Sequence, residues 1–375
     1  MRTLILRSNP IEPDPRVEKI ARTLARKGHH VVCLGWDRSD SLPVQELRDG
    51  ITIQRIRIRS EYGSGLQNFP ALLRWQIGLS RWLFSHKTDF DIIHACDFDT
   101  IIPSMLMKWM HKKKVVYDIF DFYADHLRKT PTWIKRLIRN IDLWMINKAD
   151  AVILVDDSRR SQIAGAHPKQ LIIIFNSPED VNETLEFNTT ISSQISAGLT
   201  IAYVGLLQRE RGLHEMLDVL QKRDRWHLDI AGFGGDEVEI KAIATTLHNV
   251  KWHGRTSYEL ALAISADADV LFATYDPTIE NHRYSSPNKV FEAMMLGKPI
   301  IVARNTNMDR IITEERCGLV VTYGKVNELE DALEQLDQNP EFRKLLGQNA
   351  RKAYETRYSW RVMSEQLIDL YDRIS

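Results

Sequence analysis

The residues best suited to chemistry begin with a basic loop at 205–212, which lies between an apolar strand and a helical segment. Gly205 would let a ligand approach the backbone closely, and the loop also carries Arg209 and Arg211. A phosphate group there would meet free backbone N–H groups, the positive end of a helix and two guanidinium groups. The loop therefore predicts a diphosphate site, with a tight turn bearing solvated arginines as the structural alternative.

A second candidate is the segment 285–299. Its sequence predicts a capped helix with a proline near the first turn, a glycine that ends the helix, and then a strand. Ser286, Asn288 and Lys289 lie at the start of this helix. Glu292 is a carboxylate among apolar residues on a helix that must pack against a sheet, and a half-buried acid needs hydrogen-bond donors. Two vicinal ribose hydroxyls would supply them; a lysine partner or a neighbouring strand end is the alternative.

Polar side chains also follow two apolar segments of the N-terminal half. His94 and Asp97 end one expected strand, and Asp118 and Asp121 end the next. Polar residues at the ends of parallel strands are placed to reach a ligand, so these four could orient an acceptor hydroxyl. A histidine satisfied within the fold, and aspartates that cap helices, are the alternatives.

Several common enzyme classes lack their signature in this chain. The loop 8–16 has prolines where a dinucleotide-binding protein has glycines, and the segment after Gly232 places Glu237 where a third glycine is needed, which argues against hydride transfer. We also find no Walker loop, zinc-ligand cluster, Gly-x-Ser-x-Gly elbow or helical His-Glu-x-x-His. Phosphatase, protease and hydrolase classes therefore have no support.

The elements that must position these residues alternate between short apolar runs and amphipathic helical segments, which predicts parallel sheets. The expected strands are 3–6, 31–34, 51–58, 92–94, 115–117 and 151–155, then 200–204, 227–231, 250–252, 270–273, 298–302 and 318–322. The polar stretch 177–198 between the two series is the expected linker. The sequence thus predicts an α/β protein of two doubly wound, Rossmann-like domains with a ligand site in the cleft between them.

Composition agrees with two globular domains in a reducing compartment. The chain has 375 residues, about twice a typical domain, with 43% hydrophobic and 27% charged residues. Cys33, Cys96 and Cys317 match neither a disulfide framework nor a zinc spacing. The run 1–6 is too short for a signal peptide, and no stretch is apolar enough for a membrane span. We therefore expect a soluble cytoplasmic protein.

Charge is unevenly distributed along the chain. Residues 1–150 carry 25 Lys and Arg against 17 Asp and Glu, although the whole chain is neutral. Within this half, 132–148 and 72–84 place apolar and basic residues at helical spacing. Such a helix can lie on an anionic membrane, and a core helix with a solvated basic face is the alternative. We expect the protein to contact an anionic inner membrane face peripherally, and we expect no nucleic-acid partner.

Together these segments resemble the retaining glycosyltransferases of family 4, in the same order and over nearly the whole chain. The loop 205–212 is similar to the family's Gly-Arg-Leu-x-x-x-Lys-Gly loop, 250–255 to its later strand-and-glycine segment, and 286–299 to its paired-glutamate region. Segments 91–97 and 175–176 resemble looser family patterns. The final helix near 360–374 resembles the one that crosses back to the first domain.

The resemblance implies the GT-B fold, with an acceptor-side domain at 1–185, a nucleotide-sugar-binding domain at 186–357, and 358–375 packing back on the first. It implies transfer of a hexose-type sugar from a UDP- or GDP-sugar to a glycan or lipid-linked acceptor, with retention and with no metal or cofactor. Arg209, Arg211 and Lys289 would bind the diphosphate, and Glu292 the ribose. The implied donor-binding set is Gly205, Arg209, Arg211, Gly232, Arg255, Ser286, Asn288, Lys289 and Glu292, and the acceptor-side set is His94, Asp97, Asp118 and Asp121.

Three positions depart from the family pattern. Leu206 stands where the family usually has a diphosphate-binding arginine, and Cys96 replaces a common histidine. Tyr284 stands at the first glutamate of the pair, as in a subgroup with a Ser-Pro-x-Lys-type loop. Two alternatives therefore stay open: a nucleotide-sugar epimerase on the same fold, and a catalytically silent membrane-associated homologue.

Overall fold

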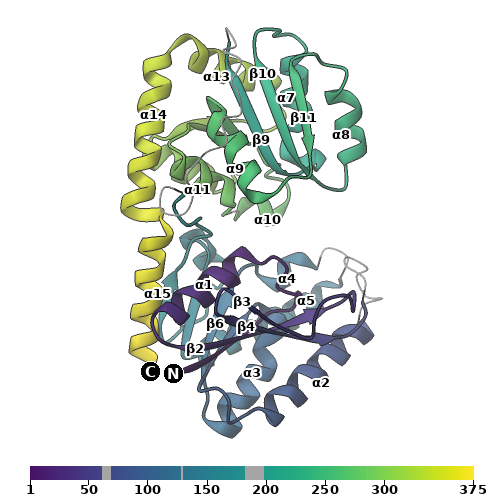
Figure 1. The fold of residues 1–375 in the computed structure, drawn as a ribbon, viewed down its shortest axis with the longest axis vertical. Coiled ribbons are helices and arrows are strands. Elements are labelled where there is room, and N and C mark those ends of the chain that lie inside the picture. The colour runs from purple at the N-terminus through teal and green to yellow at the C-terminus, as the bar shows by residue number, and fades with distance from the viewer. Residues whose placement is uncertain (61–68, 128–129, 182–197, 285) are drawn as a thin grey trace. The chain divides into compact units, whose positions relative to one another are not determined.

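The computed structural model describes residues 1–60, 69–127, 130–181, 198–284 and 286–375, which form two compact units (Figure 1). The first unit comprises Met1–Phe175 and Ser364–Ser375, and the second Asn176–Met363. The expected boundary at 185/186 and most of the expected linker lie outside the described residues. No helix in the described part of the chain is both long and apolar enough to cross a membrane.

The first unit is built on an eight-stranded sheet in the order β3-β4-β2-β1-β5-β6-β7-β8. Its strands are β1 (Arg2–Leu6), β2 (His30–Asp37), β3 (Gln45–Arg48), β4 (Ile51–Arg57), β5 (Ile92–Cys96), β6 (Lys114–Ile119), β7 (Ala151–Leu154) and β8 (Leu171–Ile173). Every neighbouring pair is parallel except β3 with β4, which is antiparallel. The strands expected from the sequence are therefore parallel to one another, and the antiparallel edge strand β3 was not among them. Short edge strands escape prediction because they carry little apolar periodicity, and the sequence of β3 has a single apolar side chain.

Helices of the first unit are α1 (Pro15–Arg26), α2 (Phe69–Ser85), α3 (Phe98–His111), α4 (Tyr123–His126), α5 (Thr132–Lys148) and the 3₁₀ turn η2 (Asp157–Ser161). Helix α1 begins as its sequence predicts, since Pro15 opens the first turn and the Asp14 carboxylate accepts the Val17 N–H at 3.2 Å. Helices α2, α3 and α5 bury apolar residues in one cluster with β1 and β2, where Trp36 stacks on Trp75 at 5.1 Å. This cluster is the core that holds the strand ends in place.

The second unit is built on a six-stranded, entirely parallel sheet in the order β11-β10-β9-β12-β13-β14. Its strands are β9 (Thr200–Leu206), β10 (His227–Phe233), β11 (Val250–Gly254), β12 (Val270–Ala273), β13 (Ile300–Ala303) and β14 (Gly318–Val321). The other elements are η3 (Arg209–Arg211), α7 (Leu213–Leu220), α8 (Glu237–Ala244), α9 (Tyr258–Asp267), α10 (Glu280–Arg283), α11 (Asn288–Met295), α12 (Met308–Glu315), α13 (Val326–Gln338), α14 (Pro340–Ala353) and the π turn η4 (Tyr354–Tyr358). All six strands expected from the sequence for this half are present.

The C-terminal helix α15 (Trp360–Ile374) starts in the second unit, and its residues from Ser364 onward belong to the first. Within the first unit Tyr371 is buried, and its hydroxyl lies 2.9 Å from His94 Nδ1. The expected return of the last helix to the first domain is therefore confirmed.

Each sheet reverses its strand order at one point. In the first unit β1 lies between β2 and β5, and in the second β9 lies between β10 and β12. Ligands of open α/β sheets bind beyond the carboxyl ends of the strands at such a point. The residues that follow β1 and β5, and those that end β9 and β12, are therefore where each unit is built to bind a ligand.

Candidate active site

At the reversal point of the second unit, Gly205 leaves room for the side chain of Lys289. A Cβ atom built on Gly205 would lie 2.6 Å from Lys289 Cε and 2.7 Å from Nζ, and the backbone φ there is +147°. Any other residue would strain the chain at this φ, and the end of the Lys289 side chain would have to move away from the new Cβ. The sequence predicts that this glycine lets a ligand approach the backbone, and the structure adds a second reason for a glycine here.

Lys289 is partly buried as a residue, but its ammonium nitrogen is fully buried and lacks a hydrogen-bond partner among the described residues. Its Nζ lies 3.4 Å from the ring centroid of Tyr203 and 5.9 Å from that of Tyr275. Burial, and then the charge of Arg211, lower the pKa of Lys289 well below its ordinary value. An unpartnered buried ammonium is costly, so this position favours an anionic ligand.

Arg211 adds a second positive charge to the same place. Its guanidinium lies over the Tyr275 ring at 4.0 Å, and its Nε donates to Gln208 Oε1 at 3.4 Å. Gly212, with φ +73°, lets the loop pass close to Thr274, where an added Cβ would lie 1.9 Å from Oγ1. That hydroxyl is also buried without a hydrogen-bond partner in the described structure. Two cations and an unsatisfied hydroxyl therefore meet at the end of β12.

The other expected donor-binding residues around the strand ends have partners of their own. Arg209 is exposed, and its Nη2 donates to both carboxylate oxygens of Glu239 on α8, at 2.6 and 2.9 Å. Arg255 lies over the Phe233 ring at 4.7 Å. Gly232 allows β10 to pack tightly on β9, because a Cβ there would lie 1.8 Å from the Gly205 carbonyl oxygen. The structure thus brings Gly205, Arg211 and Lys289 together, whereas Arg209 is held by an acid.

Around α11, the remaining expected residues are placed as follows. Glu292 is partly buried on this helix, and its carboxylate accepts the Tyr258 hydroxyl at 3.2 Å. Ser286 is buried just before the helix, and its carbonyl accepts the Asn176 side chain at 3.4 Å. Asn288 is the first residue of α11, one position after the Pro287 cap. Glu292 is therefore on the helix that carries Lys289, one turn further along.

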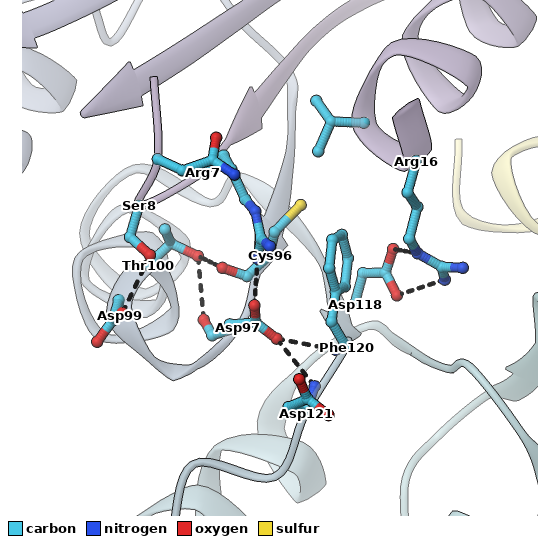
Figure 2. Close-up of polar contacts among 12 residues, drawn as sticks. Arg7, Ser8, Arg16, Cys96, Asp97, Asp99, Thr100, Asp118, Phe120 and Asp121 are labelled. Atoms are coloured by element: carbon cyan, nitrogen blue, oxygen red, sulfur yellow. Dashed lines mark hydrogen bonds and ion pairs between the residues drawn. The ribbon is translucent and has the colours of Figure 1, made fainter. Parts of the chain in front are cut away.

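At the reversal point of the first unit, Asp97 organises the ends of β5 and β6 (Figure 2). One carboxylate oxygen accepts the backbone N–H of Phe120 at 2.8 Å and of Asp121 at 3.4 Å, and Arg7 pairs with the other. Burial raises the pKa of Asp97 to about 6, against the opposing charge of Arg7. The φ of +62° is unusual for a residue with a side chain, and these contacts hold it.

His94 and Asp118 lie fully buried beside this network. His94 Nε2 donates to Asp118 at 3.3 Å, and Arg16 donates to both Asp118 oxygens at 2.8 and 3.1 Å. Burial alone would raise the pKa of Asp118, yet Arg16 and then His94 hold it below its ordinary value. In this arrangement both residues connect strand ends to α1 and α15 and have no exposed surface.

Asp121, by contrast, is partly exposed and pairs with Arg159 at 2.8 Å. The ligand atoms of His94, Cys96 and Asp118 lie within 4.8 Å of one another, close enough to hold a metal ion. However, Arg16 already occupies both Asp118 oxygens with positive charge. The donor set therefore fits an ion-paired support better than a metal centre.

Sequence reasoning missed Arg7, which bonds Asp97 and donates from Nε to Asp14 at 2.9 Å. Its guanidinium also lies over the Phe120 ring at 4.1 Å. Its position directly after the first strand could have indicated it, because polar residues at strand ends are the basis on which Asp97 and Asp118 were predicted. The three cysteines are all buried and free.

Comparison with known proteins places this geometry in a class. The family description "Glycosyl transferases group 1" matches residues 192–353, and "Glycosyltransferase Family 4" matches residues 16–177. A glycogen synthase of Mycobacterium tuberculosis is 20% identical over 384 residues, covering 95% of this chain and 89% of that protein.

Two solved structures match the whole chain. Sucrose-phosphate synthase from Thermosynechococcus elongatus has a TM-score of 0.79 at 16% identity, covering 100% of this chain and 99% of that one. Anabaena Alr3699/HepE, solved in complex with UDP and glucose, has a TM-score of 0.73 at 15% identity and covers 100% of both chains.

Two Rossmann-like α/β units in this order are the GT-B fold. The matched family descriptions and the named relatives then identify the enzyme class: the chain is a GT-B glycosyltransferase.

Proposed function

We propose that this glycosyltransferase binds a UDP- or GDP-sugar on its second unit and transfers a hexose-type sugar with retention to a glycan or lipid-linked acceptor. The observation that carries the donor site is Lys289, a buried ammonium with no hydrogen-bond partner in the described structure, next to Arg211. A diphosphate supplies the oxygens that the Lys289 ammonium lacks, and it adds charged acceptors for Arg211. The UDP bound by Anabaena Alr3699/HepE supports a nucleoside diphosphate as the ligand class.

The diphosphate would bind between Arg211 and Lys289, at the N-terminal end of α11, where free backbone N–H groups add to the positive charge. The Thr274 hydroxyl is a further donor at this place. Arg211 and Lys289 would stabilise the charge that develops on the departing diphosphate, without a metal ion or a protein nucleophile. Losing one such cation should lower turnover by about 10²–10³, as with a single oxyanion-hole donor.

Glu292 would accept the ribose hydroxyls. Its carboxylate already accepts one hydroxyl, that of Tyr258, at 3.2 Å. It lies one helical turn after Lys289, which suits the separation between the ribose and the diphosphate of one nucleotide.

Thermal shift tests the donor site. We expect either uridine or guanosine diphosphates and their sugars to stabilise the protein, and Glu292→Ala and Arg211→Ala to abolish that effect. The matched control is Arg283→Ala, an exposed arginine of the same unit. Stabilisation by no nucleotide, or equal stabilisation of all variants, would contradict the proposal and favour a silent homologue. Nucleoside diphosphate released only when acceptor is present separates a transferase from an epimerase.

We further propose that the first unit meets an anionic membrane through an apolar face on α3 and α5. This face comprises exposed Trp109 and Met110 at the end of α3, and Trp133, Leu137 and Trp144 on α5. Trp109 and Trp144 contact each other with ring centroids 5.2 Å apart. Large exposed apolar side chains gathered on two neighbouring helices are uncommon unless they bind something.

The charges around the apolar face favour lipid as its partner. Arg136 and Lys148 of α5, and Lys112 after α3, are exposed among these apolar side chains. Basic residues beside tryptophans suit an anionic headgroup layer, which would bring a lipid-linked acceptor to this unit.

Flotation with liposomes tests the apolar face. The protein should float with phosphatidylglycerol-containing vesicles at low salt and not with neutral ones, and Trp133→Ser with Trp144→Ser should abolish flotation. Val238→Ser, which removes an exposed apolar residue of the second unit, is the control. Absence of flotation at every salt concentration would refute membrane contact.

A further inference from the structure

The amine of Lys289 is surrounded by groups that replace its contacts with water only in part. Nζ is fully buried and has no hydrogen-bond partner among the described residues. It lies 3.4 Å from the ring centroid of Tyr203, whose hydroxyl donates to the Leu206 carbonyl oxygen. A Cβ on Gly205 would lie 2.7 Å from Nζ, so the backbone leaves the amine little space on that side. A ring face attracts an ammonium, but it does not replace the hydrogen-bond acceptors that the ammonium has in water.

A second cation faces the same aromatic ring. The guanidinium of Arg211 lies 4.0 Å from the Tyr275 ring centroid, and Lys289 Nζ lies 5.9 Å from that centroid. A guanidinium keeps its proton in proteins, whereas a buried lysine readily loses it. Of these two cations, the lysine is therefore the one that can relieve the repulsion by becoming neutral.

The other titratable groups at this place leave that tendency in force. They are Tyr203 on β9, Glu210 on η3, Tyr258 on α9, Tyr275 and Asp276 after β12, His282 on α10 and Glu292 on α11. Burial lowers the pKa of His282, so this histidine adds no charge above about pH 6.5. Burial also raises the pKa of Tyr203 and of Tyr275, which keeps both hydroxyls neutral. Burial and then Arg211 lower the pKa of Lys289, although the charge of Glu292 opposes them.

A bound diphosphate would reverse both effects on the amine. Its oxygens would supply the acceptors that the ammonium lacks, and its negative charge would offset the charge of Arg211. Hydrogen bonds from an ionised donor to phosphate are also stronger than those from a neutral one. The amine should therefore hold its proton more tightly when the donor is bound.

We propose that binding of the nucleotide sugar is coupled to the uptake of a proton by the amine of Lys289. The lone pair of the amine takes this proton from solvent, no other bond changes, and the proton returns to solvent when the nucleoside diphosphate leaves. This inference rests on the proposed function and adds a pH dependence to it. Donor affinity falls as pH rises, with Kd increasing by at most about tenfold per pH unit.

Carbon-13 NMR of the full chain, labelled at the lysine Cε atoms, follows this proton directly. In the free protein, one signal that Lys289→Met removes should titrate below the range of exposed lysines. The probe is whichever of UDP-glucose, UDP-galactose and GDP-mannose stabilises the protein in thermal shift. Adding it should raise the midpoint of that signal by at least about one pH unit.

Lys298 provides the matched control for this titration. Burial lowers its pKa as well, but it lies just before β13, at the amino end of the strands, whereas Gly205 lies at their carboxyl end. Its signal, assigned with Lys298→Met, should have the same midpoint with and without the nucleotide sugar.

Titration calorimetry in buffers of different ionisation enthalpy counts the protons taken up. The diphosphate of a nucleotide sugar has no proton to lose near neutral pH, so uptake between about pH 6.5 and 8.5 reports on the protein. The wild type should take up as much as one proton per nucleotide sugar as pH rises through this range, while its Kd increases. Lys298→Met should take up the same number.

Three results would overturn the inference. The Lys289 signal could titrate in the range of exposed lysines, its midpoint could stay unchanged on binding, or the nucleotide sugar could bind without proton uptake throughout the range. In the last two cases the donor site stands, because the nucleotide sugar binds. If no nucleotide sugar binds, the donor site itself is refuted, and the coupling with it.

Discussion

Replacing Lys289 with methionine should stabilise the unliganded protein and at the same time destroy donor binding. The ammonium is buried, lacks a hydrogen-bond partner in the described residues and has a pKa well below its ordinary value. Burying a polar group without a partner costs about 1–3 kcal/mol, and methionine fills a similar volume without that cost. In a unit of this size each kcal/mol raises Tm by about 2–4 °C, so Lys289→Met should melt several degrees higher.

The pH dependence of this gain follows from the direction of the pKa shift. Since the pKa of Lys289 is lowered in the folded state, the cost of the buried ammonium is greatest at low pH. It declines as pH rises from the folded-state value towards 10.5, where the unfolded chain also loses its proton. The stability gain of Lys289→Met should shrink over that window.

Calorimetry with and without nucleoside diphosphate, at several pH values, measures both effects. Lys222→Met, an exposed lysine of the same unit, should change neither Tm nor the nucleotide response. A Lys289→Met variant with a lower Tm, or one that kept the full nucleotide-induced shift, would contradict this prediction. The first result would mean that the ammonium has a stabilising partner, and the second that the anion binds elsewhere.

Three further changes probe the fold and the site. Gly205→Ala should abolish nucleotide-induced stabilisation, because its Cβ would lie 2.6 Å from Lys289 Cε, and isothermal titration measures the loss. Asp142→Asn should flatten the pH dependence of urea unfolding: burial raises the pKa of Asp142 to about 7, so its contribution to stability is lost as pH rises from about 4 to 7. Tyr371→Phe should cost about 1 kcal/mol in the same assay by removing the hydroxyl next to His94.

The strands of this protein could be predicted where a buried run of apolar residues makes the pattern continuous. Strand β12 matches its expected range of 270–273, and helix α5 matches 132–148. Strands β3 and β8 were not predicted because they are short edge strands with partly exposed residues. Local sequence cannot show that such a segment pairs, since the pairing depends on a neighbouring strand being present.

Parts of the candidate site were accessible from sequence and others were not. The basic loop and the start of α11 were each recognisable from helix punctuation, so Arg211 and Lys289 could be chosen. That Gly205 is needed to admit Lys289 could not be seen, because the two lie 84 positions apart and meet only after the sheet forms. Likewise, Asp97 looked available until Arg7 and two backbone N–H groups were found to occupy it.

Leu206 is one of three positions that depart from the family pattern, and its surroundings bear on whether the chain is a silent homologue. Leu206 is exposed at the end of β9 and adds no charge, so the positive charge at this strand end comes from Arg211 and Lys289. A protein without a donor ligand would be more stable with an apolar residue at 289, because the buried ammonium has nothing to offset it. The presence of that lysine, together with a glycine that admits it, favours a chain that still binds an anion over a silent homologue.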